Sequence, residues 1–180
     1  MEHAHPYSIL KWALEQEPRP TQIAFAESCT GGRLAADFTA FPGSSRVICG
    51  SLVAYQTRVK QQVLGLKGVT EDNVVSAETA KQMARAALDL FQADVALSTT
   101  GYLDTEHPLA FVGLAIRGEP GLILLAEAVL EDPVDGLIRM PRPNPRDRAL
   151  NREVVIDAAF DLLASFASPK TPPKTLSNSL

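Results

Sequence analysis

This sequence has few cysteines, no excess of positive charge and no long apolar run. Two cysteines among 180 residues are too few for a disulfide framework, so we expect reduced thiols and a cytoplasmic location. A net charge of −4 argues against a broad nucleic-acid-binding surface. No apolar run reaches the roughly 18 residues that a membrane helix needs. The N-terminus lacks the apolar core of a secretory signal.

The composition is typical of one globular domain. Hydrophobic residues make up 46% of the chain and charged residues 21%, which suits a chain of this length with an ordinary core. We assign residues 1–167 to a single domain. Residues 168–180 are predicted to be a disordered tail.

Predicted strands and helices alternate along the chain. Apolar runs predict strands at residues 22–26, 47–54, 94–100, 109–117 and 122–131. Helical spacing predicts helices at residues 8–17, after Gly32, at 57–64, from 76 to 91, and at 147–166. Turn residues at 118–121 predict an antiparallel hairpin. The order predicts an α/β fold, a three-layer α/β/α sandwich with a mainly parallel mixed sheet.

The first predicted strand leads into a polar turn and two glycines. Residues 23–32 read Ile-Ala-Phe-Ala-Glu-Ser-Cys-Thr-Gly-Gly, and a helix follows. Strand, turn and helix in this order direct backbone N–H groups and a positive helix end at one point, where an oxyanion could be stabilised. Ser28 lies at that point, either as a nucleophile or as the N-cap of the helix.

Other polar residues are expected at the same rim. Ligands of open α/β sheets bind beyond the carboxyl ends of the strands, and this rule gathers Glu27, Ser28, Tyr55, Thr100 and Gly101. Tyr55 either lines a pocket there or belongs to the core.

Several motifs in order resemble the CinA C-terminal domain family. They are Ala-Glu-Ser-Cys-Thr-Gly-Gly at 26–32, Pro-Gly-Ser-Ser at 42–45, Val-Ala-Tyr at 53–55 followed by Lys60 and Leu-Gly at 64–65, Val-Ser at 75–76 and Thr-Gly at 100–101. The resemblance covers roughly residues 8–166. It implies a homodimer or larger assembly and the hydrolysis of nicotinamide mononucleotide to nicotinate mononucleotide and ammonia, without a metal or other cofactor.

The resemblance also implies the site residues. Ser28 would be the nucleophile, Lys60 its base and Tyr55 a further catalytic residue. The substrate-binding residues would be Glu27, Thr30, Gly31, Gly32, Thr100, Gly101, Arg148 and Arg152, with the two arginines near a phosphate. We expect N–H groups at the start of the helix after Gly31 and Gly32 to hold the oxyanion. Glu27 either orients Lys60 or a substrate hydroxyl, or forms a structural ion pair. The two arginines either bind an anion or lie on the helix surface.

One segment departs from the family pattern. A glycine-rich loop usually follows the Thr-Gly of the third strand, whereas residues 102–108 here read Tyr-Leu-Asp-Thr-Glu-His-Pro. Glycine-rich loops let backbone N–H groups approach a phosphate closely, and Asp104 and Glu106 would repel one unless they point away. The alternative function is therefore a catalytically inactive or substrate-shifted relative that binds a different small nucleotide or amide.

Two further groups of side chains offer other chemistry. Cys29 adjoins Ser28 and is an alternative nucleophile, but the absence of an evident histidine partner argues against that role. His107, Asp104 and Glu106 either hold a metal or are solvated loop residues, and we expect no metal site.

Overall fold

The computed structural model describes residues 5–118, 123–127 and 147–167. The elements, in chain order, are α1 (Pro6–Leu14), β1 (Ile23–Glu27), α2 (Arg33–Thr39), the short 3-10 helix η1 (Ser44–Arg46), β2 (Ile48–Val53), α3 (Thr57–Gln62), α4 (Ala77–Leu90), β3 (Val95–Tyr102), β4 (Leu109–Ile116), β5 (Ile123–Glu127) and α5 (Arg148–Ala167). The predicted tail at 168–180 and most of the predicted hairpin turn lie outside the described residues.

The five strands form one mixed sheet in the order β2-β1-β3-β4-β5. β1 pairs in parallel with β2 and β3, while β4 pairs antiparallel with β3 and with β5. Only β4 is therefore reversed, which confirms a mainly parallel sheet with a β4–β5 hairpin. The antiparallel β3–β4 pair was not predicted. Residues 103–108, which join these strands, are too few for a parallel crossover of a dozen or more residues.

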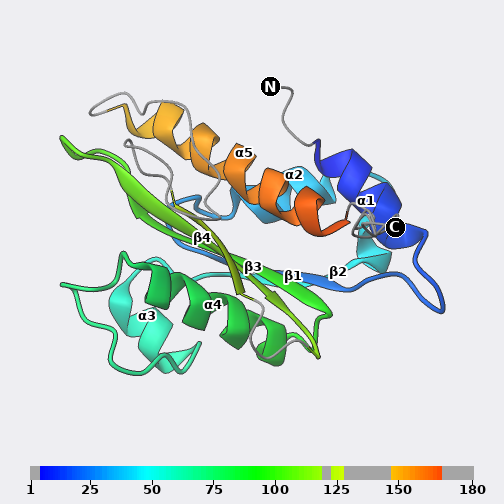
Figure 1. Ribbon diagram of the computed structural model, residues 1–180, viewed down its shortest axis with the longest axis horizontal. Helices are drawn as coiled ribbons and strands as arrows, with labels where there is room; N and C mark the ends of the chain where they lie inside the picture. Colours follow the sequence, from blue (N-terminus) through cyan, green and yellow to red (C-terminus); the bar gives the residue numbers. More distant parts are fainter. Residues whose placement is uncertain (1–4, 119–122, 128–146, 168–180) are drawn as a thin grey trace, which may run out of the picture.

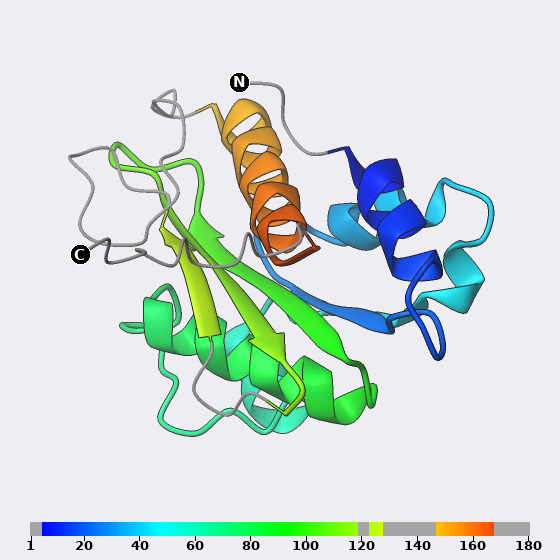
Figure 2. The same ribbon diagram turned by 45° about the vertical axis from the view of Figure 1, so that its right-hand side comes forward.

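Helices cover both faces of the sheet and give the three predicted layers. α1, α2 and α5 lie on one face, and α3 and α4 lie on the other (Figures 1 and 2). Side chains of β1 alternate between these faces. Ile23 and Phe25 belong to the larger hydrophobic cluster, whereas Ala24 and Ala26 belong to the cluster that contains Met83 of α4. None of the described helices is long and apolar enough to cross a bilayer.

Local contacts explain where several elements begin and end. α1 starts two residues before its predicted position because the His5 side chain caps it. α4 begins after Ser76, whose hydroxyl accepts a hydrogen bond from Thr79 N at 3.1 Å, and serine is a favoured N-cap residue. β3 extends past its predicted end because it pairs with β4 as far as Tyr102 and Leu109.

Candidate functional site

A cleft of about 550 Å³ lies where β1, β2 and β3 reach their carboxyl ends. Parallel strands end at the same edge of a sheet, so this is the position where ligands bind in such folds. Residues from three strand ends, α3 and α5 contribute to its lining. The cleft brings together six of the predicted site residues: Ser28, Tyr55, Lys60, Thr100, Gly101 and Arg148.

Ser28 and Lys60 are in direct contact at the base of the cleft. Ser28 follows β1 and is 7% exposed, while Lys60 belongs to α3 and is fully buried. Lys60 Nζ lies 2.9 Å from Ser28 Oγ. It also donates hydrogen bonds to the backbone oxygens of Ala54 at 2.8 Å and Tyr55 at 3.3 Å. The backbone just after β2 therefore positions the Lys60 amine beside the Ser28 hydroxyl.

Burial shifts the amine of Lys60 toward its neutral form. Burial lowers the pKa of Lys60, because a low-dielectric interior disfavours the charged ammonium. A neutral amine has two N–H groups and one lone pair. The oxygens of Ala54 and Tyr55 can accept both N–H groups, which leaves the lone pair for the hydroxyl proton of Ser28. The pair can therefore act as a nucleophile and its general base.

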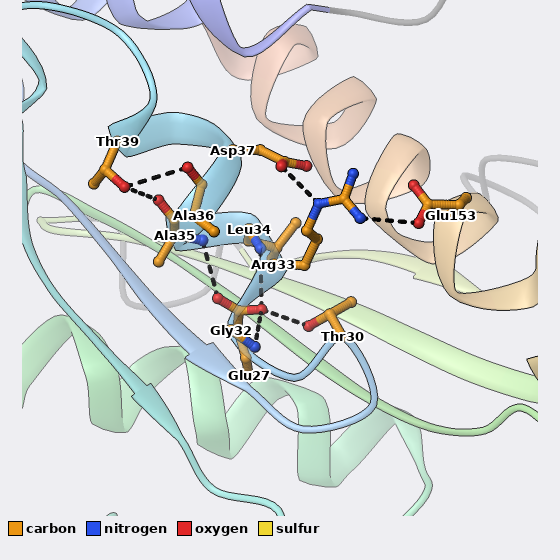
Figure 3. A network of polar contacts seen from close by, with 10 residues as sticks. All are labelled: Glu27, Thr30, Gly32, Arg33, Leu34, Ala35, Ala36, Asp37, Thr39 and Glu153. Atoms are coloured by element: carbon orange, nitrogen blue, oxygen red, sulfur yellow. Dashed lines mark hydrogen bonds and ion pairs between the residues drawn. The ribbon is translucent and has the colours of Figure 1, made fainter. Parts of the chain in front are cut away.

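Glu27 caps helix α2. Its side chain is fully buried, and its carboxylate accepts hydrogen bonds from the backbone N–H groups of Gly32 at 2.9 Å, Leu34 at 3.1 Å and Ala35 at 3.0 Å (Figure 3). Thr30 Oγ1 donates to the same carboxylate at 2.7 Å. A negative charge at a helix N-terminus is favourable. Glu27, which was expected to bind substrate, thus lies outside the cleft lining and stabilises the start of α2.

The N–H groups at the start of α2, which we expected to hold the oxyanion, are already bonded within the protein. The N–H group of Gly32 is bound by the Glu27 carboxylate, and Gly31 N donates to the backbone oxygen of Ser28 at 3.1 Å. Within the described residues, no other residue accepts a hydrogen bond from the backbone N–H of Cys29 or Thr30. The N–H group just after a nucleophilic serine is a common oxyanion donor.

Thr99 holds the turn around Ser28 in place, and sequence reasoning missed it. Its Oγ1 lies 2.8 Å from Thr30 Oγ1 and accepts from Ser28 N at 3.4 Å. The Thr30 hydroxyl proton goes to Glu27, so Thr99 donates to Thr30. Thr99 lies within a buried strand, and nothing in the sequence distinguishes it from an ordinary core residue.

Thr100 and Gly101 line the cleft, and each also has contacts within the fold that favour its residue type. Thr100 Oγ1 donates to the backbone oxygen of Val74 at 2.8 Å. A Cβ atom on Gly101 would lie 2.6 Å from the Cβ of Ala110 and 2.9 Å from the backbone oxygen of Leu109. A side chain at position 101 would therefore push β3 and β4 apart.

Arg148, the first residue of α5, reaches the rim of the cleft. Its guanidinium group donates one hydrogen bond to the Tyr55 hydroxyl and another, 3.1 Å long, to the Asp104 carboxylate. Arg152 does not line the cleft, and within the described residues its Nε atom is buried without a hydrogen-bond partner. Only one of the two predicted phosphate-binding arginines therefore lines the cleft, and that one already holds a carboxylate.

Three other cleft residues were missed by sequence reasoning. Glu71, Arg58 and Tyr102 all contribute to the lining. Arg58 Nε donates to Gln56 Oε1 at 2.6 Å, and the Tyr102 hydroxyl donates to the backbone oxygen of Glu71 at 3.2 Å. Glu71 belongs to a polar stretch between helices, where acidic residues are common in ordinary loops.

The alternative chemistries find little support in the geometry. Burial raises the pKa of Cys29 to about 12, so its thiol stays protonated at neutral pH and is a poor nucleophile. Asp104, Glu106 and His107 do not gather into a metal-binding group, and no such group of three or more side chains occurs among the described residues.

Comparisons with known proteins agree with this architecture. The model of the CinA C-terminal domain family matches residues 11–167. A CinA-like protein of Shewanella amazonensis is 31% identical over 148 residues, which are 78% of this chain and 32% of that protein. A CinA-like protein of Leptospira borgpetersenii is 48% identical over 81 residues, 44% of this chain and 19% of that protein. The chain thus spans less than a third of the length of these curated relatives.

Solved structures share the fold. The competence/damage inducible protein CihA from Agrobacterium tumefaciens superimposes with a TM-score of 0.70 at 27% identity, covering 89% of this chain and 96% of that chain. A competence or damage-inducible protein from Enterobacter asburiae gives a TM-score of 0.72 at 21% identity, covering 91% and 96%.

Proposed function

The chain belongs to the CinA C-terminal domain family, and from that premise we propose that it is a metal-independent amidohydrolase. Its substrate would be the carboxamide of nicotinamide mononucleotide or of a close pyridine relative, and its products the corresponding acid and ammonia. The observation that carries the proposal is the contact between Lys60 Nζ and Ser28 Oγ at 2.9 Å beside the cleft. A buried lysine amine that touches a serine hydroxyl meets the requirement of a nucleophile for an adjacent base.

In the first half of the reaction, Ser28 Oγ attacks the carboxamide carbon. Neutral Lys60 takes the hydroxyl proton, and the carbonyl oxygen becomes an oxyanion. The C–N bond then breaks, Lys60 gives the proton to the leaving nitrogen, and ammonia departs. An ester between Ser28 and the substrate acyl group remains.

In the second half, water hydrolyses that ester. Lys60 takes a proton from the attacking water, the Ser28–acyl bond breaks, and the proton returns to Ser28 Oγ. The acid product leaves and the free enzyme is restored. The same lysine acts as base and then as acid in each half, which suits a group whose pKa is lowered by burial.

Backbone groups supply the remaining requirements of this scheme. The N–H groups of Cys29 and Thr30, which no other described residue uses, would stabilise the oxyanion. The backbone oxygens of Ala54 and Tyr55 hold the amine of Lys60. The Tyr55 ring lines the cleft as a wall for the substrate, and its hydroxyl accepts a hydrogen bond from Arg148.

The proposal is tested by ammonia release from nicotinamide mononucleotide, with chromatographic identification of the acid product. We expect turnover by the wild-type protein and a loss of about 1,000-fold or more in Ser28→Ala. Ser165→Ala is the matched control, because it makes the same change on α5, where the hydroxyl only donates to the backbone oxygen of Leu162. Full activity in Ser28→Ala, or no ammonia from any nicotinamide compound with wild-type protein, would overturn the proposal.

A further inference from the structure

The arginine of α5 that a substrate anion would meet in the cleft already binds a carboxylate. Arg148 and Arg58 line the cleft, and so does the carboxylate of Glu71. The Asp104 carboxylate binds the Arg148 guanidinium at 3.1 Å, with both side chains partly exposed. Lys60 is turned toward backbone oxygens and Ser28. Arg148 is therefore already paired with a carboxylate, and a second carboxylate, that of Glu71, lines the same cleft.

A phosphate group would be poorly accommodated beside Asp104. A phosphate monoester carries nearly two negative charges at neutral pH. To bind Arg148 it would have to displace the Asp104 carboxylate or lie against it, and like charges at close range repel. The carboxylate belongs to the segment 102–108, which has no glycine and so cannot offer the closely approaching N–H groups of a glycine-rich loop.

The same features suit a flat cation. The rings of Tyr55 and Tyr102 are 55% and 46% exposed and both line the cleft. Aromatic faces attract a positively charged ring, and the Glu71 carboxylate lies in the same lining. A pyridinium nucleoside, which carries a positive ring and no phosphate, matches this combination of aromatic faces and carboxylate.

We infer that Asp104 is a specificity-determining residue: by holding Arg148, it makes the cleft select an unphosphorylated pyridinium nucleoside over the phosphorylated nucleotide. The inference rests on the proposed function, because it names the substrate class of the Ser28–Lys60 site. The chemical step is unchanged, since the carboxamide is the same in both compounds.

The kinetic test compares nicotinamide riboside with nicotinamide mononucleotide as substrates. We expect a higher kcat/KM for the riboside in the wild-type protein. Asp104→Asn, which removes one charge from the contact, should raise the ratio of kcat/KM for the nucleotide over the riboside by about tenfold. Glu106→Gln is the matched control, because Glu106 is an exposed residue of the same loop that does not contact Arg148, and it should change the ratio by less than about twofold.

Two kinetic outcomes would overturn the inference. One is a wild-type preference for the nucleotide. The other is an Asp104→Asn ratio that stays close to the wild-type ratio or equals that of Glu106→Gln. Thermal unfolding of each variant shows whether it is folded before its kinetics are read.

Calorimetric titration separates this inference from the proposed hydrolysis. Both compounds are titrated into wild-type protein and into Ser28→Ala, where no covalent step interferes. Tighter binding of the riboside supports the inference even if no ammonia is released. Tighter binding of the nucleotide, or binding of neither compound, overturns it.

Discussion

Lys60 Nζ and Ser28 Oγ lie 2.9 Å apart although 32 residues separate them in the chain. The sheet explains the contact. β1 and β2 are parallel neighbours, so the residues that follow each strand meet at one edge, and α3 begins soon after β2. The fold therefore assembles the nucleophile and its base from two successive strand–helix units, with the backbone after β2 fixing the position of the amine.

The pH dependence of catalysis should report on Lys60. Only the deprotonated amine accepts the Ser28 proton, so kcat/KM should rise with pH and level off above the pKa of Lys60. Burial lowers this pKa, so the midpoint should fall below the ordinary lysine value of about 10.4. A pH–rate profile of the wild-type protein measures it. A midpoint at or above the ordinary value would contradict the assigned base.

Cys29 should be dispensable for the reaction despite its place beside Ser28. Its thiol is 4% exposed, and burial raises the pKa of Cys29 to about 12, so the thiolate is scarce at pH 7. Cys29→Ser should keep kcat/KM within about threefold of the wild-type value. In the folded protein, a thiol-alkylating reagent followed by peptide mass spectrometry should modify the half-buried Cys49 first. A Cys29→Ser loss as large as that of Ser28→Ala would refute this assignment.

Glu27 should matter for stability because it caps α2. Glu27→Ala leaves three backbone N–H groups and the Thr30 hydroxyl without their acceptor, so the free energy of unfolding should fall by about 3 kcal/mol or more. Denaturant titration measures the loss. Ser51→Ala is the matched control: Ser51 Oγ makes only a 3.4 Å contact with the same carboxylate, and its removal should cost less than about 1 kcal/mol. Equal losses in the two variants would contradict the capping role.

Elements with a strong repeating pattern could be predicted from the sequence. The apolar strands β1 and β2 and the amphipathic helix α4, with its Ser76 cap, lie close to their predicted positions, because burial of one face imposes a regular spacing. The direction of β4 could not be read from its residues. Its apolar run suits either direction, and only the short connection at 103–108 decides between them.

The candidate site was harder to predict because its contacts join distant segments. The sequence alone indicated Ser28 as a polar residue after a strand, while Lys60 was assigned only through the family resemblance. The capping role of Glu27 depends on the path of α2, and the Arg148–Asp104 contact spans 44 residues. Neither interaction leaves a local pattern in the sequence. An acidic residue at a strand end, such as Glu27, suits binding and capping equally well.

A double-mutant cycle on kcat/KM tests the central claim most directly, with ammonia release measured for wild type, Ser28→Ala, Lys60→Met and the double variant. If Ser28 and Lys60 act as one unit, each single substitution should cost about as much as both together, on the order of 1,000-fold or more. Additive losses, or a Lys60→Met protein with nearly wild-type activity, would contradict the account.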